Sequence, residues 1–200
     1  MINTKRLRCT LGVLALLLPW IVCLLLWDIP PSISATYYTY EAGPVFMIIL
    51  GASSFLLFSY KGYERQDDIV YSLAGIFGIC ICLFPTEVKS LHLDYAGTFQ
   101  LPVKVSEILH CTSAITFFVL LAYGSLFLFT KGDGNPTKNK KIRNIIFRVC
   151  GIGMILSFTL LLIPKSVLYC KVWLVEAIAL FFFGVSFLTK ANCFKWLFAD

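Results

Sequence analysis

Two ionisable residues near the start of one long apolar segment are the strongest candidates for chemistry in this chain. Glu107 and His110 stand three positions apart in the segment 105–130, which continues as a largely apolar run. In an α-helix this spacing places both side chains on one face. Ionisable groups within an apolar helix cost free energy unless they face protein or water, so they often mark functional sites. The spacing therefore predicts a site at one end of this helix.

Metal binding is one chemistry that the pair suggests. A Glu-x-x-His element supplies ligands in carboxylate-containing helical bundles, and zinc accepts carboxylate oxygens and neutral imidazole nitrogens. His92 and Asp94, in the preceding segment, are the further candidate ligands beside Glu107 and His110. The sequence does not identify the cofactor, for which zinc or another metal is the candidate.

Two interpretations without a metal stay open. A pocket for a lipid, a small molecule or an ion could combine Glu107 and His110 with Glu41, Lys171 and Glu176, all expected near the same surface. Alternatively, Glu107 or Glu176 pairs with Lys171 and His110 forms a hydrogen bond inside the bundle, with no ligand. Buried polar groups need such partners because an unpaired charge in an apolar interior costs several kcal/mol.

The composition indicates the framework that must position these residues. Of 200 residues, 58% are hydrophobic and 14% are charged, whereas about a quarter of the residues in a soluble domain are charged. A membrane-spanning helix needs about 20 largely apolar residues, and no segment alternates as in a membrane β-barrel. The sequence predicts an all-α transmembrane bundle forming a single domain over 1–200, with six helices at 10–27, 43–60, 68–85, 105–130, 142–163 and 169–189.

The distribution of basic residues predicts the orientation. Lysine and arginine are enriched on the cytoplasmic side of membrane proteins. With both termini in the cytoplasm, thirteen of these residues face that side and four face outward. The first apolar run lacks a following small-residue cleavage site, so we expect a retained helix rather than a signal peptide. The predicted location is the bacterial inner membrane.

A basic loop at 131–144 is the candidate surface for partners. Its simplest role is to fix the topology, and the alternative is contact with anionic lipids or with an acidic cytoplasmic partner. The net charge of +6 is attributed to these roles, so direct nucleic-acid binding is not expected. The residues concerned are Lys138, Lys140, Lys141 and Arg143.

The cysteines and aromatic residues have simple expected roles. Most of the eight cysteines are expected to be small buried hydrophobic residues, and Cys9 and Cys193 are expected to be cytoplasmic. Cys111 and Cys170, both near the outer surface, are the one pair placed to form a disulfide. An interfacial belt, or else the lining of a sugar or headgroup site, is predicted for Trp27, Tyr37, Tyr38 and Tyr40.

Several strings resemble a family of small uncharacterised bacterial multi-pass membrane proteins. The resemblance covers about 32–190 and implies six helices without an established activity. At Glu41-Ala42 the chain departs from an Arg-Asp pair expected in that family. The strings are Ser32-Ile-Ser34 with Tyr37-Tyr38-Thr39, the turn Phe58 to Asp68, Leu83-Phe-Pro-Thr86, His110, Leu126 to Lys131 and Trp173-Leu-Val-Glu-Ala-Ile-Ala179.

A second similarity concerns an enzyme class. Ser106-x-x-x-His110 is similar to the Ser-x-x-x-His element of the membrane hydrolases and receptors related to alkaline ceramidases. That resemblance implies zinc bound by three histidines and a further aspartate, whereas this chain has two histidines. The resemblance therefore extends to one element of the hydrolase pattern.

Three functions follow as hypotheses. The favoured one is non-enzymatic binding or sensing of a lipid, small molecule or ion. The alternatives are a homo-oligomeric pore or membrane-perturbing effector, by analogy with accessories of CRISPR-type defence systems, and a metal-dependent lipid hydrolase. The sequence has no Walker loop, Gly-x-Ser-x-Gly elbow or Rossmann fingerprint, which sets those enzyme classes aside.

Overall fold

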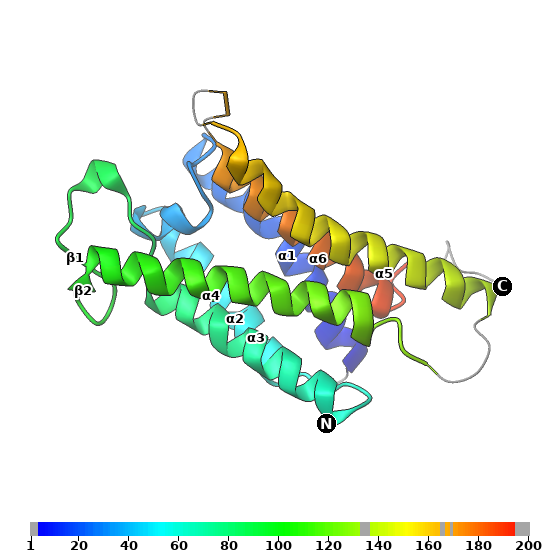
Figure 1. The fold of residues 1–200 in the computed structure, drawn as a ribbon. Coiled ribbons are helices and arrows are strands. Elements are labelled where there is room, and N and C mark those ends of the chain that lie inside the picture. The colour runs from blue at the N-terminus through cyan, green and yellow to red at the C-terminus, as the bar shows by residue number, and fades with distance from the viewer. Residues whose placement is uncertain (1–3, 133–136, 165–166, 169, 195–200) are drawn as a thin grey trace.

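The chain forms a bundle of antiparallel helices. The computed structural model describes residues 4–132, 137–164, 167–168 and 170–194. A π-helical turn, Gly124–Leu128, continues α4, and a 3-10 turn, Phe158–Leu162, continues α5. The six α-helices among the described residues are α1 (Thr4–Leu26), α2 (Gly43–Phe58), α3 (Arg65–Leu83), α4 (Val103–Tyr123), α5 (Lys138–Ser157) and α6 (Lys171–Lys190) (Figure 1).

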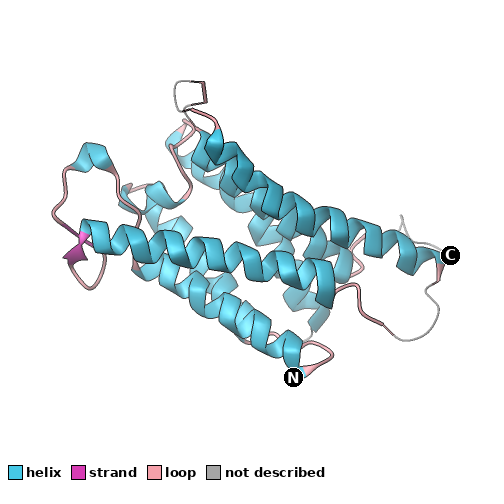
Figure 2. Ribbon diagram, viewed as in Figure 1, coloured by secondary structure: helices cyan, strands magenta, loops and turns pink. Residues whose placement is uncertain are grey.

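Helices adjacent in the chain pack side by side, and α6 packs against α1, so the six helices close into a ring. The α1–α2 and α4–α5 pairs are in less extensive contact than the other four neighbouring pairs. Short elements interrupt the loops: two 3-10 helices, Ser34–Tyr38 and Lys89–Leu91, and an antiparallel pair of strands, β1 (Tyr95–Ala96) and β2 (Leu101–Pro102). Figure 2 shows this hairpin at one end of an otherwise helical molecule.

The two ends of the bundle are used below as reference points. We call the end that carries β1 and β2 the hairpin end. The start of α1 and the end of α6 lie together at the opposite end (Figure 1), where Cys9 and Cys193 are bonded. We call this the disulfide end.

Five helical segments are long and apolar enough to span a membrane: 4–26, 65–83, 103–128, 138–162 and 171–190. The sixth helix, α2, has 16 residues, which at 1.5 Å per residue is about 24 Å and shorter than a bilayer core of about 30 Å. The sequence predicted six helices that each span the membrane, and α2 is shorter than such a span requires. The helix ends early because the chain turns at Ser59 and the ring of Tyr60 becomes buried in the core.

Local capping explains why two helices begin earlier than expected. At α3, the N-cap Glu64 and the third residue Asp67 form a reciprocal capping box, which satisfies N–H groups that have no partner within the helix. With this cap, α3 starts at Arg65 rather than at 68. At α5, the side chain of Thr137 accepts a hydrogen bond from the Lys140 N–H group at 3.3 Å. The helix therefore starts at Lys138 rather than at 142.

Small residues allow two pairs of helices to approach closely. A Cβ atom on Gly75 of α3 would lie 2.6 Å from the carbonyl oxygen of Ser54 and 2.7 Å from the backbone nitrogen of Phe58, both in α2. Between α1 and α6, a Cβ atom on Gly12 would lie 2.9 Å from the carbonyl oxygen of Gly184. Glycine at these positions brings the helix backbones into contact, which is how small residues support packing in membranes.

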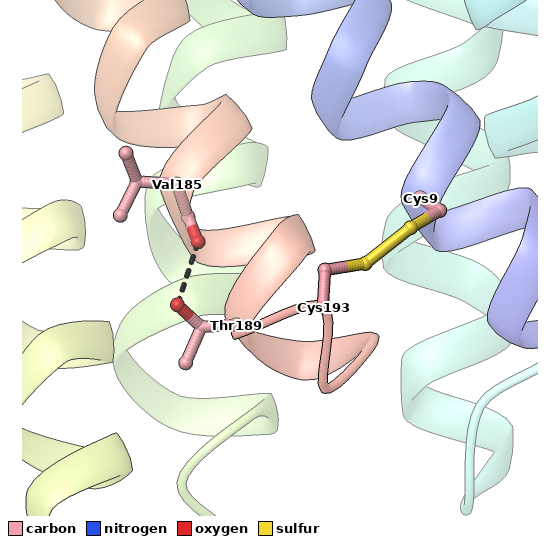
Figure 3. The surroundings of a disulfide bond; sticks show 4 residues. All are labelled: Cys9, Val185, Thr189 and Cys193. Atoms are coloured by element: carbon pink, nitrogen blue, oxygen red, sulfur yellow. Dashed lines mark hydrogen bonds between the residues drawn. A yellow bond between two sulfur atoms is a disulfide. The ribbon is translucent and has the colours of Figure 1, made fainter. Parts of the chain in front are cut away.

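A disulfide joins Cys9 in α1 to Cys193 after α6 (Figure 3). Beside it, the Thr189 hydroxyl donates to the Val185 carbonyl oxygen at 2.8 Å within α6. The pairing of Cys111 with Cys170, which the sequence left open, is not formed, because both are free thiols. The bonded pair is separated by 184 residues in the chain and comes together because α6 packs against α1.

Candidate functional site

A cavity of about 540 Å³ opens between the helices toward the hairpin end. We call it the hairpin-end cavity. Its walls are mostly apolar side chains from α1, α2, α3, α4 and α6, including Leu18, Phe46 and Phe118. Its polar lining comes from α4, α6 and the loops that precede α2 and α4. The ionisable side chains that line it are Glu87, Lys89, Glu107, His110, Cys111 and Glu176.

Helix α4 holds the chain segment that follows α3. The carboxylate of Glu107 accepts hydrogen bonds from the Thr86 hydroxyl at 2.8 Å and from the Glu87 N–H group. One turn away, His110 Nδ1 lies 2.7 Å from the Phe84 carbonyl oxygen. A carbonyl oxygen can only accept, so Nδ1 carries the proton in this contact. The Ser106 hydroxyl adds a bond to the Pro85 carbonyl oxygen at 2.8 Å.

Helix α6 holds the loop between α1 and α2 in the same way. The Glu176 carboxylate accepts from the Ile33 N–H group at 2.5 Å and from the Ser34 hydroxyl at 2.8 Å. The first turn of α6 is also tied to this loop, because the backbone N–H group of Trp173 donates to the Pro31 carbonyl oxygen at 3.2 Å. The carboxylate at 176 therefore links α6 to a segment more than 140 positions away.

The structure thus brings Glu107, His110 and Glu176 to one cavity. Each carboxylate oxygen can accept about two hydrogen bonds. Each oxygen of Glu176 accepts one of the two donors from the loop before α2. Glu107 accepts from Thr86 and Glu87 at one oxygen and from the Cys111 thiol at the other, at 3.3 Å, so each carboxylate retains an acceptor position. The two carboxylates can therefore hold the loops and still face a ligand.

The remaining candidate residues do not join this group. Glu41 is exposed to solvent just before α2. The Lys171 ammonium donates to the carbonyl oxygens of Leu161 and Ile163, at 2.8 and 2.6 Å, so it caps the end of the α5 segment. The open interpretation in which Lys171 pairs with Glu107 or Glu176 does not match these contacts.

The candidate metal ligands are divided between different places. His92 and Asp94 lie exposed in the loop before α4, and His92 lines a separate cavity of about 360 Å³. Across the described ranges, no group of three or more His, Cys, Asp or Glu side chains is arranged to hold a metal ion. The four predicted ligands therefore do not form one donor set.

Sequence reasoning missed the partners of the two carboxylates. Thr86, Phe84 and Ser34 belong to loops, and nothing in their own residue types predicts contact with a distant helix. One signal was available: the strings Ser32-Ile-Ser34, Leu83-Phe-Pro-Thr86 and Trp173-Leu-Val-Glu176 were already singled out by resemblance. In the structure all three meet at the hairpin-end cavity.

The predicted basic partner surface separates into two kinds of residue. Lys138 and Lys141 are exposed on α5. Lys140 and Arg143 instead line a cavity of about 610 Å³ at the disulfide end. Residues one position apart on this helix therefore have different surroundings.

The aromatic residues near the hairpin end also divide. Trp27 and Tyr40 are 88% and 94% exposed, as residues at a membrane interface would be. Tyr37 and Tyr38 are half-buried and pack edge to face with ring centroids 5.0 Å apart. Burial raises the pKa of the Tyr38 hydroxyl above its usual value. The predicted belt therefore rests on Trp27 and Tyr40.

No family model, no curated protein and no solved structure matches this chain. The resemblance to bacterial multi-pass proteins accordingly stays a prediction, and function has to be argued from the cavities.

Proposed function

We propose that this chain is an integral membrane protein that binds an amphiphilic molecule without chemical conversion. The ligand would place its apolar part against the walls of the hairpin-end cavity and its head group against Glu107 and Glu176. The observation that carries this proposal is the meeting of two carboxylates in one otherwise apolar cavity. A volume of about 540 Å³ falls in the range of small-molecule sites, about 300 to 1,000 Å³.

The lining favours a head group that is cationic or rich in hydrogen-bond donors. Glu87, Glu107 and Glu176 line the cavity together with one lysine, Lys89. Glu87 is paired with Lys104 at 2.6 Å, which leaves the carboxyl groups of Glu107 and Glu176 to interact with a head group. Carboxylates accept hydrogen bonds and attract cations, so an amine-bearing amphiphile fits this lining better than a fatty acid.

A pair of alanines provides a matched test of the cavity. Ala114 lines it, whereas Ala52 is exposed on α2. We expect calorimetry on detergent-purified protein to show binding of octylamine and weaker binding of octanoate. Because phenylalanine would fill the cavity, A114F should abolish octylamine binding while A52F leaves it unchanged. Equal binding of the amine and the acid, or wild-type binding by A114F, would contradict the proposal.

The orientation of the protein is part of the same proposal. We place the disulfide end in the cytoplasm because Lys and Arg residues concentrate there, and the location is the bacterial inner membrane. The Cys9–Cys193 bond favours the opposite orientation, since disulfides are rare in the cytosol. On our assignment, both cysteines are reduced in the cell.

Reporter fusions test the orientation. A green fluorescent protein joined after residue 194 should fluoresce, and alkaline phosphatase joined there should be inactive, because the fusion point lies in the cytoplasm. Truncation after Tyr40, which follows one helix, should give the reverse pattern. Active phosphatase after residue 194 would place the disulfide end outside. In that case, alkylation of unreduced cells should label two fewer cysteines than alkylation after reduction.

A further inference from the structure

A strongly basic cavity lies at the disulfide end, away from the hairpin-end cavity. We call this cavity of about 610 Å³ the basic cavity. Its cationic side chains come from α1, from the turn after α4, from α5 and from α6. They are Arg8, Lys131, Lys140, Arg143 and Lys190.

Three of these cations are held in place by neighbouring groups. The Lys190 ammonium donates to the Phe129 carbonyl oxygen at 3.2 Å and lies 4.9 Å from the centroid of the Phe129 ring. The Arg8 Nε–H group donates to the Tyr60 hydroxyl at 3.1 Å. A guanidinium has five N–H donors, so this bond uses only part of the capacity of Arg8. Arg143 is positioned by a 2.8 Å bond from Nη1 to the Asn192 side chain.

The acidic countercharge is small. Glu64 is the one acidic residue among the described residues that line the basic cavity, and its carboxylate pairs with Lys131 at 2.7 Å. This bond raises the pKa of Lys131 above its usual value. The neighbouring Asp67 accepts from the Tyr63 N–H group and belongs to the α3 capping box. Among the described residues that line the cavity, five cationic side chains therefore share one carboxylate.

We propose that the basic cavity binds a phosphate-bearing anion. Arginine and lysine are the side chains that recognise phosphate, arginine through paired N–H donors and lysine as a compact charge. The side chains of Asn144 and Asn192 also line the cavity and can donate further hydrogen bonds. The phosphate belongs either to the headgroup of an anionic lipid or to a soluble phosphorylated molecule. This site does not depend on the function proposed for the hairpin-end cavity.

The alternation of residues along α5 supplies a matched pair of variants. Lys140 and Arg143 line the basic cavity, and Lys138 and Lys141 are exposed on the same helix. K140Q/R143Q and K138Q/K141Q remove the same charge from the protein. We expect the first to weaken pyrophosphate or lipid binding by about 10-fold to 100-fold, since charge-assisted bonds to phosphate are lost, and the second to change it less than about two-fold.

A third variant separates loss of a site from loss of folding. Glu64→Gln removes the one acidic lining charge and keeps a side-chain oxygen for the α3 cap. E64Q should tighten anion binding several-fold, because it removes the negative charge that offsets the cationic lining. Lys131 then loses its ion pair and keeps its bond to the Gln66 side chain at 2.9 Å. A merely destabilised protein would not gain affinity, so unchanged or weaker binding by E64Q overturns the proposal.

The source of the phosphate is distinguished by two measurements on the full chain. Calorimetry with inorganic pyrophosphate in detergent supports a soluble ligand if it shows saturable binding. Native mass spectrometry from nanodiscs containing phosphatidic acid and phosphatidylcholine supports a lipid headgroup if phosphatidic acid alone is retained. Absence of binding in both measurements, or equal losses in the two double variants, overturns the proposal.

Discussion

Replacing Glu176 with alanine is expected to lower the free energy of unfolding by about 3 kcal/mol, because hydrogen bonds to charged groups contribute about 1.5 to 3 kcal/mol each. The carboxylate holds the Ile33 N–H group and the Ser34 hydroxyl at 2.5 and 2.8 Å. Its removal leaves both donors without that partner and weakens the attachment of the loop before α2 to α6, which then depends on the backbone hydrogen bond from Trp173 to Pro31. Thermal unfolding in detergent, followed by size-exclusion fluorescence, should show a clear drop in midpoint temperature.

The control for this variant is Glu41→Ala. Glu41 is exposed, so E41A should unfold at the wild-type temperature although it loses the same charge. A Glu176→Gln protein keeps one acceptor oxygen and should fall between E176A and wild type. If E176A were as stable as E41A, the link between α6 and the loop would not contribute to stability.

The second large effect is expected from a glycine between α2 and α3. A Cβ atom at Gly75 would meet two backbone atoms of α2 at 2.6 and 2.7 Å, and backbone cannot move aside as a side chain can. Overpacking in a tightly packed interface costs about 1 to 3 kcal/mol. G75A should therefore destabilise the protein by about 1 to 3 kcal/mol, in the same unfolding assay.

Gly51, in α2, gives the matched control. A Cβ atom there would meet no other atom within 4 Å. Alanine favours a helix over glycine by about 0.8 to 1.0 kcal/mol, so G51A should be neutral or stabilising. The two substitutions add the same methyl group, and effects of equal sign would show that the α2–α3 contact is looser than described.

The helical architecture was largely predictable because it depends on local composition. Long apolar segments predict helices wherever they occur, and the five long spans correspond to predicted segments. The ends of helices were less predictable, since they depend on single caps such as Thr137 before α5 and Glu64 before α3. The early end of α2 depends on burial of Tyr60, which is a tertiary effect.

The site was predictable in part for the same physical reason. Helical geometry alone places Glu107 and His110 on one face, and the structure finds both at the hairpin-end cavity. Their partners lie in loops whose positions follow from packing of the whole bundle. Lys171 illustrates the difference, because it was grouped with the carboxylates by depth in the membrane but bonds to carbonyl oxygens of its own neighbourhood.

The unequal helix contacts divide the ring into two groups of helices, which we call leaves. Helices α2, α3 and α4 form one leaf, α5, α6 and α1 form the other, and the less extensive α1–α2 and α4–α5 contacts join them. Both cavities are lined from both leaves, at opposite ends of the boundary between them. A rocking motion that widened one cavity would narrow the other. Ligands at the two ends would then oppose each other's binding, and by thermodynamic reciprocity each would do so by the same factor.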